Sequence, residues 1–278
     1  MKLKIRHVVM AAIAVSASGA AMALNVNSTT TGNVILNVWD PTTHDDFIFD
    51  TGLTQSTFSS TGSYSYNVTT DSNAGGVWSQ FLSDVGSDPL TWNVVSGYGS
   101  ASGTTTNTIT AFTTGSSAPG TSGTIANSLV NSAVATLWTY EQGGNAATGV
   151  NTSSNASVVL GSSTSNWDQD TEPTWNGNLK VTTGTDGASV GTALAFYSVA
   201  TTGQPGTANN SPSTKATLST FTYTWLFQDT SNGYVLSYNP SSSTVPLPAP
   251  LMLLLSGLAA TGILGRRRSS GAIESVAA

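Results

Sequence analysis

Three acidic residues in the second half of the chain have a spacing that suits a hard cation. Asp168, Asp170 and Glu172 occupy alternate positions just before Pro173. A loop could gather their oxygens on one ion, and calcium prefers several oxygen ligands. The Gly and the bidentate Glu of an EF-hand loop are absent at the required offsets. The spacing leaves two interpretations, a calcium site and a solvated acidic loop, and it favours the second.

Two tryptophans beside these acids suggest carbohydrate chemistry. Trp167 and Trp175 could stack on sugars, while a pair of carboxylates could act as acid and base in glycoside hydrolysis. Such a hydrolase needs two carboxyl groups about 5–10 Å apart beside exposed aromatic rings. Any two acids can be nominated in this way. We therefore rank an Asp/Glu-dependent glycoside hydrolase behind a calcium-assisted carbohydrate-binding module.

The histidine His44 lies beside Asp45 and Asp46, and it is the only histidine after the first 23 residues. A Ser-His-Asp triad would be easy to propose among so many serines, but the chain has no Gly-x-Ser-x-Gly elbow. With one histidine in the body and no cysteine, a zinc site is improbable. Asp40 and Asp50 extend the acidic group and offer a weaker cation site. We interpret His44 as a solvated residue of a hairpin turn.

The first 23 residues predict a secretory signal peptide. Three basic residues precede an apolar run over residues 8–15, and Ala21 and Ala23 form the small-residue cleavage box. The apolar run is short for a first transmembrane helix, which is the alternative. The pattern therefore predicts passage through the Sec export machinery and removal of residues 1–23 by signal peptidase.

A proline-rich motif, an apolar run and a basic cluster follow one another between residues 245 and 268. The motif is Val245, Pro246, Leu247 and Pro248, and the cluster is Arg266, Arg267 and Arg268. The uncharged run 249–265 would be about 25 Å long as a helix at roughly 1.5 Å per residue, at the short edge of a membrane span. Arginines after the span hold that end in the cytoplasm. We predict an extended linker and motif over 241–248, a transmembrane helix over 249–265 and a basic cytoplasmic tail over 266–278; a buried core helix is the alternative.

These three features in this order closely resemble the sorting tail of PEP-CTERM proteins. The usual motif of that family is Val-Pro-Glu-Pro, and Leu247 in place of Glu matches a Val-Pro-Leu-Pro subtype. The extension 269–278 is a second departure, since family members usually end soon after the basic cluster. The resemblance implies that an exosortase-type membrane protease recognises the tail, removes it, and releases or attaches the protein outside a Gram-negative, biofilm-forming cell.

The charge of the body excludes several partner classes. Only Glu274 of the fourteen acidic residues lies outside residues 24–244, and only Lys180 and Lys215 of the eight basic residues lie inside, which leaves eleven net negative charges. Such a surface cannot displace counterions from phosphates, so we expect no nucleic-acid binding. The absence of cysteine excludes a disulfide framework and a thiol nucleophile.

The body, residues 24–240, reads as mostly β, or α+β in strict terms, because threonine and aromatic residues favour half-buried strands. We predict a β-sandwich-like exported domain with two amphipathic helices. The predicted strands are 34–39, 47–50, 64–68, 90–95, 108–112, 193–199, 215–228 and 234–238. Residues 145–190 are broken by Gly, Asn and Ser and show the least order.

Two segments have a helical period. Val77, Trp78, Phe81, Leu82 and Val85 share one face of a helix that follows Gly75-Gly76 and ends at Gly86. Ile125, Leu129, Ala133 and Leu137 recur at every fourth position; Thr121 or Ser122 could cap this second helix, and Gly143-Gly144 could end it. We interpret both stripes as core-packing faces.

These patterns predict an exported, non-enzymatic protein of the cell surface or extracellular matrix. It would be anchored transiently in the inner membrane by its C-terminal helix before processing. The expected partners are the export and processing enzymes, with exopolysaccharide of a biofilm as a further partner. We expect no cofactor apart from calcium, should the acidic loop bind it.

Overall fold

A computed structural model of the chain describes residues 32–99, 108–120, 124–146, 155–161, 166–180, 187–202 and 215–238. The chain divides into two compact units, Met1–Asn239 and Pro240–Ala278, and all described residues belong to the first. The predicted signal peptide, sorting motif, apolar segment 249–265 and arginine cluster lie outside the described residues and stay predictions. Within the described ranges, no helix combines the length and apolarity that a membrane span requires.

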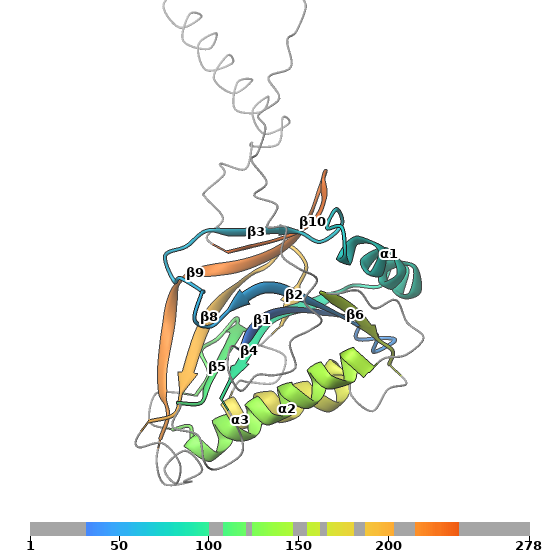
Figure 1. Ribbon diagram of the computed structural model, residues 1–278. Helices are drawn as coiled ribbons and strands as arrows, with labels where there is room; N and C mark the ends of the chain where they lie inside the picture. Colours follow the sequence, from blue (N-terminus) through green and yellow to red (C-terminus); the bar gives the residue numbers. More distant parts are fainter. Residues whose placement is uncertain are drawn as a thin grey trace, which may run out of the picture. The chain divides into compact units, whose positions relative to one another are not determined.

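The described residues form one antiparallel sheet of ten strands (Figure 1). The strand order is β3-β10-β9-β8-β5-β4-β1-β2-β6, and β7 pairs with β4 beside this path. The strands are β1 (Asn33–Trp39), β2 (Asp46–Thr54), β3 (Tyr64–Asn67), β4 (Thr91–Tyr98), β5 (Thr110–Gly115), β6 (Ala156–Val159), β7 (Ala188–Ser189), β8 (Ala193–Ala200), β9 (Thr217–Thr230) and β10 (Gly233–Tyr238). The predicted strands at all eight positions are confirmed, with ends that differ by a few residues.

The central strands are buried on both faces because their side chains alternate between two cores. In β1, Val34, Leu36 and Val38 face the first core, while Ile35 and Trp39 face the second. Both cores are completed by residues far away in sequence. The continuous apolar run of β1 therefore marks a strand buried on both sides.

The first core is enclosed by the curled sheet and by helix α1 (Ala74–Val85). Strands β8, β9 and β10 supply aromatic rings to the same core as β1, β2 and β4, which requires the sheet to bend over itself. Phe58, from the β2–β3 connection, lies among these rings, with its centroid 5.4 Å from Phe196 and 5.0 Å from Tyr238. The predicted β-rich, α+β class is thus confirmed, in the form of one continuous curled antiparallel sheet.

The second core lies between the opposite face of the sheet and helices α2 (Asn127–Ala146) and α3 (Glu172–Leu179), with the π-helical turn η1 (Trp167–Thr171). A glycine on β4 lets α2 approach closely, since a Cβ on Gly97 would lie 3.1 Å from a methyl group of Val134 and 3.2 Å from one of Leu137. Figure 1 shows α2 and α3 side by side across this face, and the two helices are in extensive contact.

Both predicted helices are present, but three of their predicted boundaries are wrong. Helix α1 contains Gly75 and Gly76, because the Asp71 carboxylate accepts the Ala74 amide at 2.8 Å and starts the helix earlier. It ends as predicted at Gly86, which has a positive φ of 67°. Helix α2 begins at Asn127, later than the predicted caps Thr121 and Ser122 require, because Ala126 forms a bridge with Lys215. It continues through Gly143-Gly144 to Ala146.

The segment 145–190 was predicted to have the least order, and that prediction is wrong for much of it. The described part contains β6, η1, α3 and β7. Asn166 starts η1 by accepting the Gln169 amide at 2.8 Å, and Pro173 occupies the first turn of α3, where its missing N–H costs nothing. Few regularly spaced apolar residues mark these elements, and each of them contacts segments far away in the sequence: η1 and α3 contact α2, β6 pairs with β2, and β7 pairs with β4.

Candidate functional site

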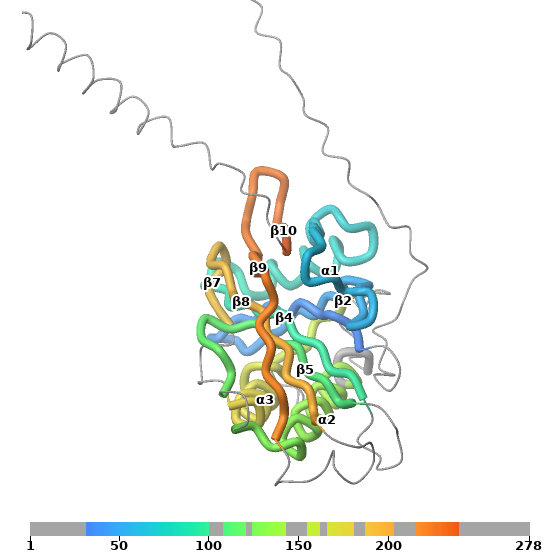
Figure 2. Tube along the Cα trace, turned by 90° about the vertical axis from the view of Figure 1, so that its left-hand side faces the viewer, coloured from blue at the N-terminus to red at the C-terminus, as the bar shows by residue number. Residues whose placement is uncertain are grey.

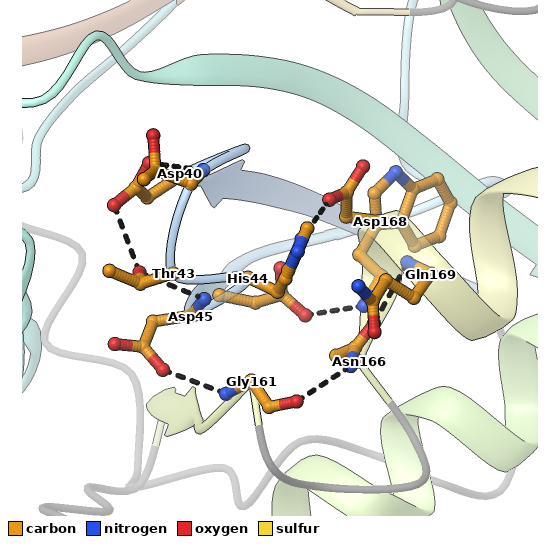
Figure 3. A network of polar contacts seen from close by, with 11 residues as sticks. Asp40, Thr43, His44, Asp45, Gly161, Asn166, Asp168 and Gln169 are labelled. Carbon is orange, nitrogen blue, oxygen red and sulfur yellow. Dashed lines mark hydrogen bonds and ion pairs between the residues drawn. The ribbon is translucent and has the colours of Figure 1, made fainter.

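The turn between β1 and β2 is attached to η1 by an ion pair between residues 124 positions apart. His44 Nδ1 lies 2.5 Å from Asp168 Oδ2, and the two side chains are 31% and 21% exposed. His44 has a φ of +62°, in the left-handed region that non-glycine residues rarely occupy. Figure 3 shows the imidazole directed at the carboxylate. The predicted turn location of His44 is confirmed, but the residue is bonded to a second segment and is only partly solvated.

The other acids of this turn are also engaged by backbone groups or hydroxyls (Figure 3). Asp40 accepts the Thr42 amide at 2.7 Å and the Thr43 hydroxyl at 2.9 Å. Asp45 accepts the Gly161 amide at 2.7 Å. Position 161 has no room for a side chain, because an added Cβ would overlap the carbonyl oxygen of Thr43. The turn is therefore fixed both internally and against the end of β6.

Asp46 lies deepest in this network. It is fully buried, and one of its oxygens accepts the backbone N–H of Trp167. Its other oxygen, Oδ1, has no hydrogen-bond partner, and the nearby hydroxyl of Tyr140 is also buried without one. Burial raises the pKa of Asp46 well above its usual value, against the opposing effect of the Trp167 amide. Asp46 therefore favours the protonated form in the folded protein.

Asp50 and Glu141 are two further buried acids, and Glu141 belongs to the C-terminal half of α2. Asp46 and Asp50 are four residues apart on β2 and share the face that α2 covers. Asp50 accepts the Asn33 side-chain amide at 2.6 Å and the Gly52 amide at 2.8 Å. Burial, and to a lesser extent the Asp50 carboxylate, raises the pKa of Glu141 to about 8. Among the described residues, the one ion pair is His44–Asp168, so no lysine or arginine neutralises these acids there.

The three residues of the predicted calcium loop lie on a helical segment and point to different partners. Asp168 binds His44, Glu172 is buried and accepts the Asn176 amide at 3.1 Å, and Asp170 is exposed. The described part of the chain contains no group of three or more His, Asp or Glu side chains arranged to hold a metal ion. The loop conformation on which the prediction depended is therefore absent, because these residues form η1 and the start of α3.

The two tryptophans nominated for sugar stacking are fully buried. Trp167 and Trp175 have no exposed surface, and their ring centroids are 6.2 Å apart in the second core. Trp167 also packs edge-on against Tyr140 at 5.2 Å, and the Trp175 Nε1 donates to Thr113 at 3.2 Å. Neither ring presents a face to a sugar.

A carboxylate on Nδ1 of a histidine is the arrangement that orients an imidazole base in hydrolases. Within the described residues, the ring's hydrogen-bond partner is Asp168, and none of the bonds around it comes from a serine. The arrangement can therefore fix a turn onto a helix, and it can orient a base. The described contacts show only the attachment of the turn to the helical segment.

Sequence reasoning missed the His44–Asp168 contact and the burial of Asp46, Asp50 and Glu141. The spacing of 124 residues carries no local signal for the ion pair. Asp46, Ile48 and Asp50 occupy alternate positions of one strand and so share one face. From this alternation the burial of the two acids could have been predicted. Comparison of the chain with family models, curated proteins and solved structures gave no match.

Proposed function

We propose that the protein is an exported component of the cell surface or extracellular matrix of a Gram-negative bacterium, sorted by an exosortase and structural rather than catalytic. The observation that carries the proposal is the order of three C-terminal features. Val245-Pro246-Leu247-Pro248 precedes the apolar run 249–265, and three arginines follow that run. A predicted signal peptide at the other end gives the body a consistent route out of the cytoplasm.

The contacts of the reactive side chains support a structural role. His44, Asp40 and Asp45 each bond to a neighbouring segment or to their own turn. The tryptophans that a sugar site would need are buried. Side chains that could do chemistry are thus used to hold the β1–β2 turn, β6 and η1 together.

The sorting step can be tested in an exosortase-containing host. We expect a Pro246→Ala, Pro248→Ala variant to accumulate in the membrane fraction with its tail attached, because the extended segment that the protease grips would be altered. The matched control is Pro240→Ala, which changes a proline outside the motif. Equal release of both variants and the unaltered protein into the medium would contradict the proposal.

A calcium-assisted carbohydrate-binding module is the second candidate, and a glycoside hydrolase using an Asp/Glu pair is the third. Calorimetry of the secreted protein with exopolysaccharide, with and without a calcium chelator, separates binding from a structural role. Heat that the chelator abolishes would support the module, and release of reducing sugar would support the hydrolase.

A further inference from the structure

Strand β9 is longer than the strand that covers its outer side. It has fourteen residues, and β8 pairs with it from Thr217 to Leu226. On the other side, β10 pairs only from Trp225 to Thr230. Residues 217–224, the open edge, therefore have no strand on their outer side among the described residues. Figures 1 and 2 show β9 continuing well past the end of β10.

Both ends of the open edge are closed by specific contacts. At one end Lys215 bridges to Ala126, and the Ala216 amide donates to the Ile125 carbonyl at 2.8 Å. At the other end the Tyr223 amide reaches the hydroxyl of Tyr238 at 3.4 Å, a long bond from a side chain where a strand carbonyl would normally be. The edge thus accommodates an extended segment of about eight residues, or about 26 Å at ~3.3 Å per residue.

The open edge lacks two of the devices that usually prevent strand addition. Natural sheets protect exposed edges with charged side chains, proline or β-bulges, and residues 217–228 contain no charge and no proline. The pairing register with β8 does shift between Ala195 and Tyr197, and such a bulge adds local twist to the edge. Continuation of β10 along this edge would meet Pro240, which has no backbone N–H to donate.

We infer that the open edge binds residues 24–31 of a second copy of this chain, added as an extra antiparallel or parallel strand. This inference rests on the proposed function, because residue 24 becomes the N-terminus only if the signal peptide is removed during export. The segment reads Leu-Asn-Val-Asn-Ser-Thr-Thr-Thr. It has eight residues, the length of the open edge, and contains no charge, proline or glycine.

Other segments adjoining the described sheet fit this edge less well. The connection 203–214 contains two prolines, and residues 239–248 contain three. Each proline removes a hydrogen-bond donor from a would-be strand. An acidic segment would also meet repulsion from a body with eleven net negative charges, which the neutral segment 24–31 avoids. Its free α-amine would add attraction.

The geometry of the sheet favours a donor from another copy over the chain's own segment. The Gly32 carbonyl accepts the Ser96 hydroxyl at 3.1 Å, and the pairing continues from Ser96 through Phe112 and Ser198 to Ser219 in the open edge. This path crosses five inter-strand spacings, or about 24 Å at ~4.8 Å each. Residues 24–31 span at most about 29 Å, and this path along the curled sheet would take most of that length. Residues 24–31 of the same chain would be extended over this distance, and few of them would remain to pair with the edge.

Strand exchange of this kind joins different surfaces of successive copies. Such a head-to-tail contact builds an open filament when its rotation does not close into a ring. Main-chain hydrogen bonds would supply the affinity, as in other cases of strand addition. The expected product is a linear assembly of exported copies, which suits a matrix component.

Disulfide trapping tests the inference directly, because the chain has no cysteine of its own. Two variants, Val26→Cys and Thr220→Cys, are co-produced in the exporting host and treated with copper phenanthroline. We expect a mixed disulfide-linked dimer in several-fold higher yield than with the matched control Ser83→Cys, an exposed position on α1. Adding Asn25→Pro and Asn27→Pro to the Val26→Cys chain should abolish the excess, because each proline removes a backbone N–H that the added strand would donate. Both positions lie before β1.

The outcomes separate this inference from the proposed function. N-terminal sequencing first establishes whether the secreted chain begins at Leu24. A chain that begins there but gives no excess of mixed dimer overturns the inference and leaves the export proposal intact. A Thr220→Cys homodimer alone would indicate pairing of two β9 strands, and a link formed only within one chain would indicate self-insertion; both overturn it. Retention of residues 1–23 would overturn both proposals.

Discussion

The two cores on opposite faces of the sheet are built from different groups. The first consists of aliphatic and aromatic side chains, with rings from five strands around Phe58. The second contains the buried carboxyl groups of Asp46, Asp50 and Glu141 among its apolar residues. Burial of apolar surface depends little on pH, whereas burial of an acid without a positive partner favours its protonated form. The comparison indicates that α2 is held less firmly at high pH than α1.

The largest expected effect lies in the first core. Phe196 is fully buried and packs against Phe58, Phe112 and Phe221. Phe196→Ala should lower the free energy of unfolding by about 3–5 kcal/mol, because it removes buried apolar surface and leaves a cavity. Urea denaturation at pH 5 and pH 9 measures the loss, with exposed Thr217→Ala as the control. A loss that differs strongly between the two pH values would contradict the statement that the first core depends little on pH.

The second prediction concerns Glu141, whose pKa is raised to about 8 in the folded protein from an ordinary 4.5. The folded state therefore binds more protons than the unfolded state between these values, and stability falls as pH rises through this range. Glu141→Gln resembles the protonated acid, so it should raise the free energy of unfolding at pH 9 by on the order of 2–5 kcal/mol. At pH 4 it should have little effect.

Denaturation of Glu141→Gln across pH 4–9 provides the measurement. If the free energy of unfolding of Glu141→Gln fell with pH as steeply as that of the unaltered protein, the buried acid would not control the stability of α2. The control is Asp84→Asn, which changes an exposed acid on α1 and should leave the profile unchanged.

The smallest expected effect is that of the ion pair between the β1–β2 turn and η1. His44→Asn keeps a residue that tolerates a positive φ, and Asp168→Asn keeps the shape of its partner. A double-mutant cycle should give a coupling of about 0.5–1 kcal/mol, since both side chains are partly exposed and solvent screens them. Zero coupling would mean that the turn is fixed by Asp45 and Asp46 alone.

Much of the fold could be predicted because its elements carry periodic apolar patterns. The aromatic face of β9, with Trp225 and Phe227 buried, followed from simple alternation. Strand β10 lies where the sequence predicts a strand, and a turn at Ser231 and Asn232 pairs it with β9. The curled form of the sheet could not be predicted, because curvature depends on which distant strands share a core.

The candidate site was less predictable, because its contacts cross long stretches of chain. The acidic stretch 168–172 was read as a loop, since its residues favour turns when considered alone. In the structure Asn166 caps it, Trp167 anchors it in the second core, and the segment becomes helical. The local sequence indicates the chemistry of these residues, but it does not show the distant neighbours that decide their conformation.

Mass spectrometry of the protein released by an exosortase-containing host tests the central claim most directly. Export and sorting predict a chain that begins at Leu24 and ends before the apolar segment 249–265, with or without an attached group. A full-length polypeptide in the cytosol, with residues 1–23 and the C-terminal arginines intact, would contradict it.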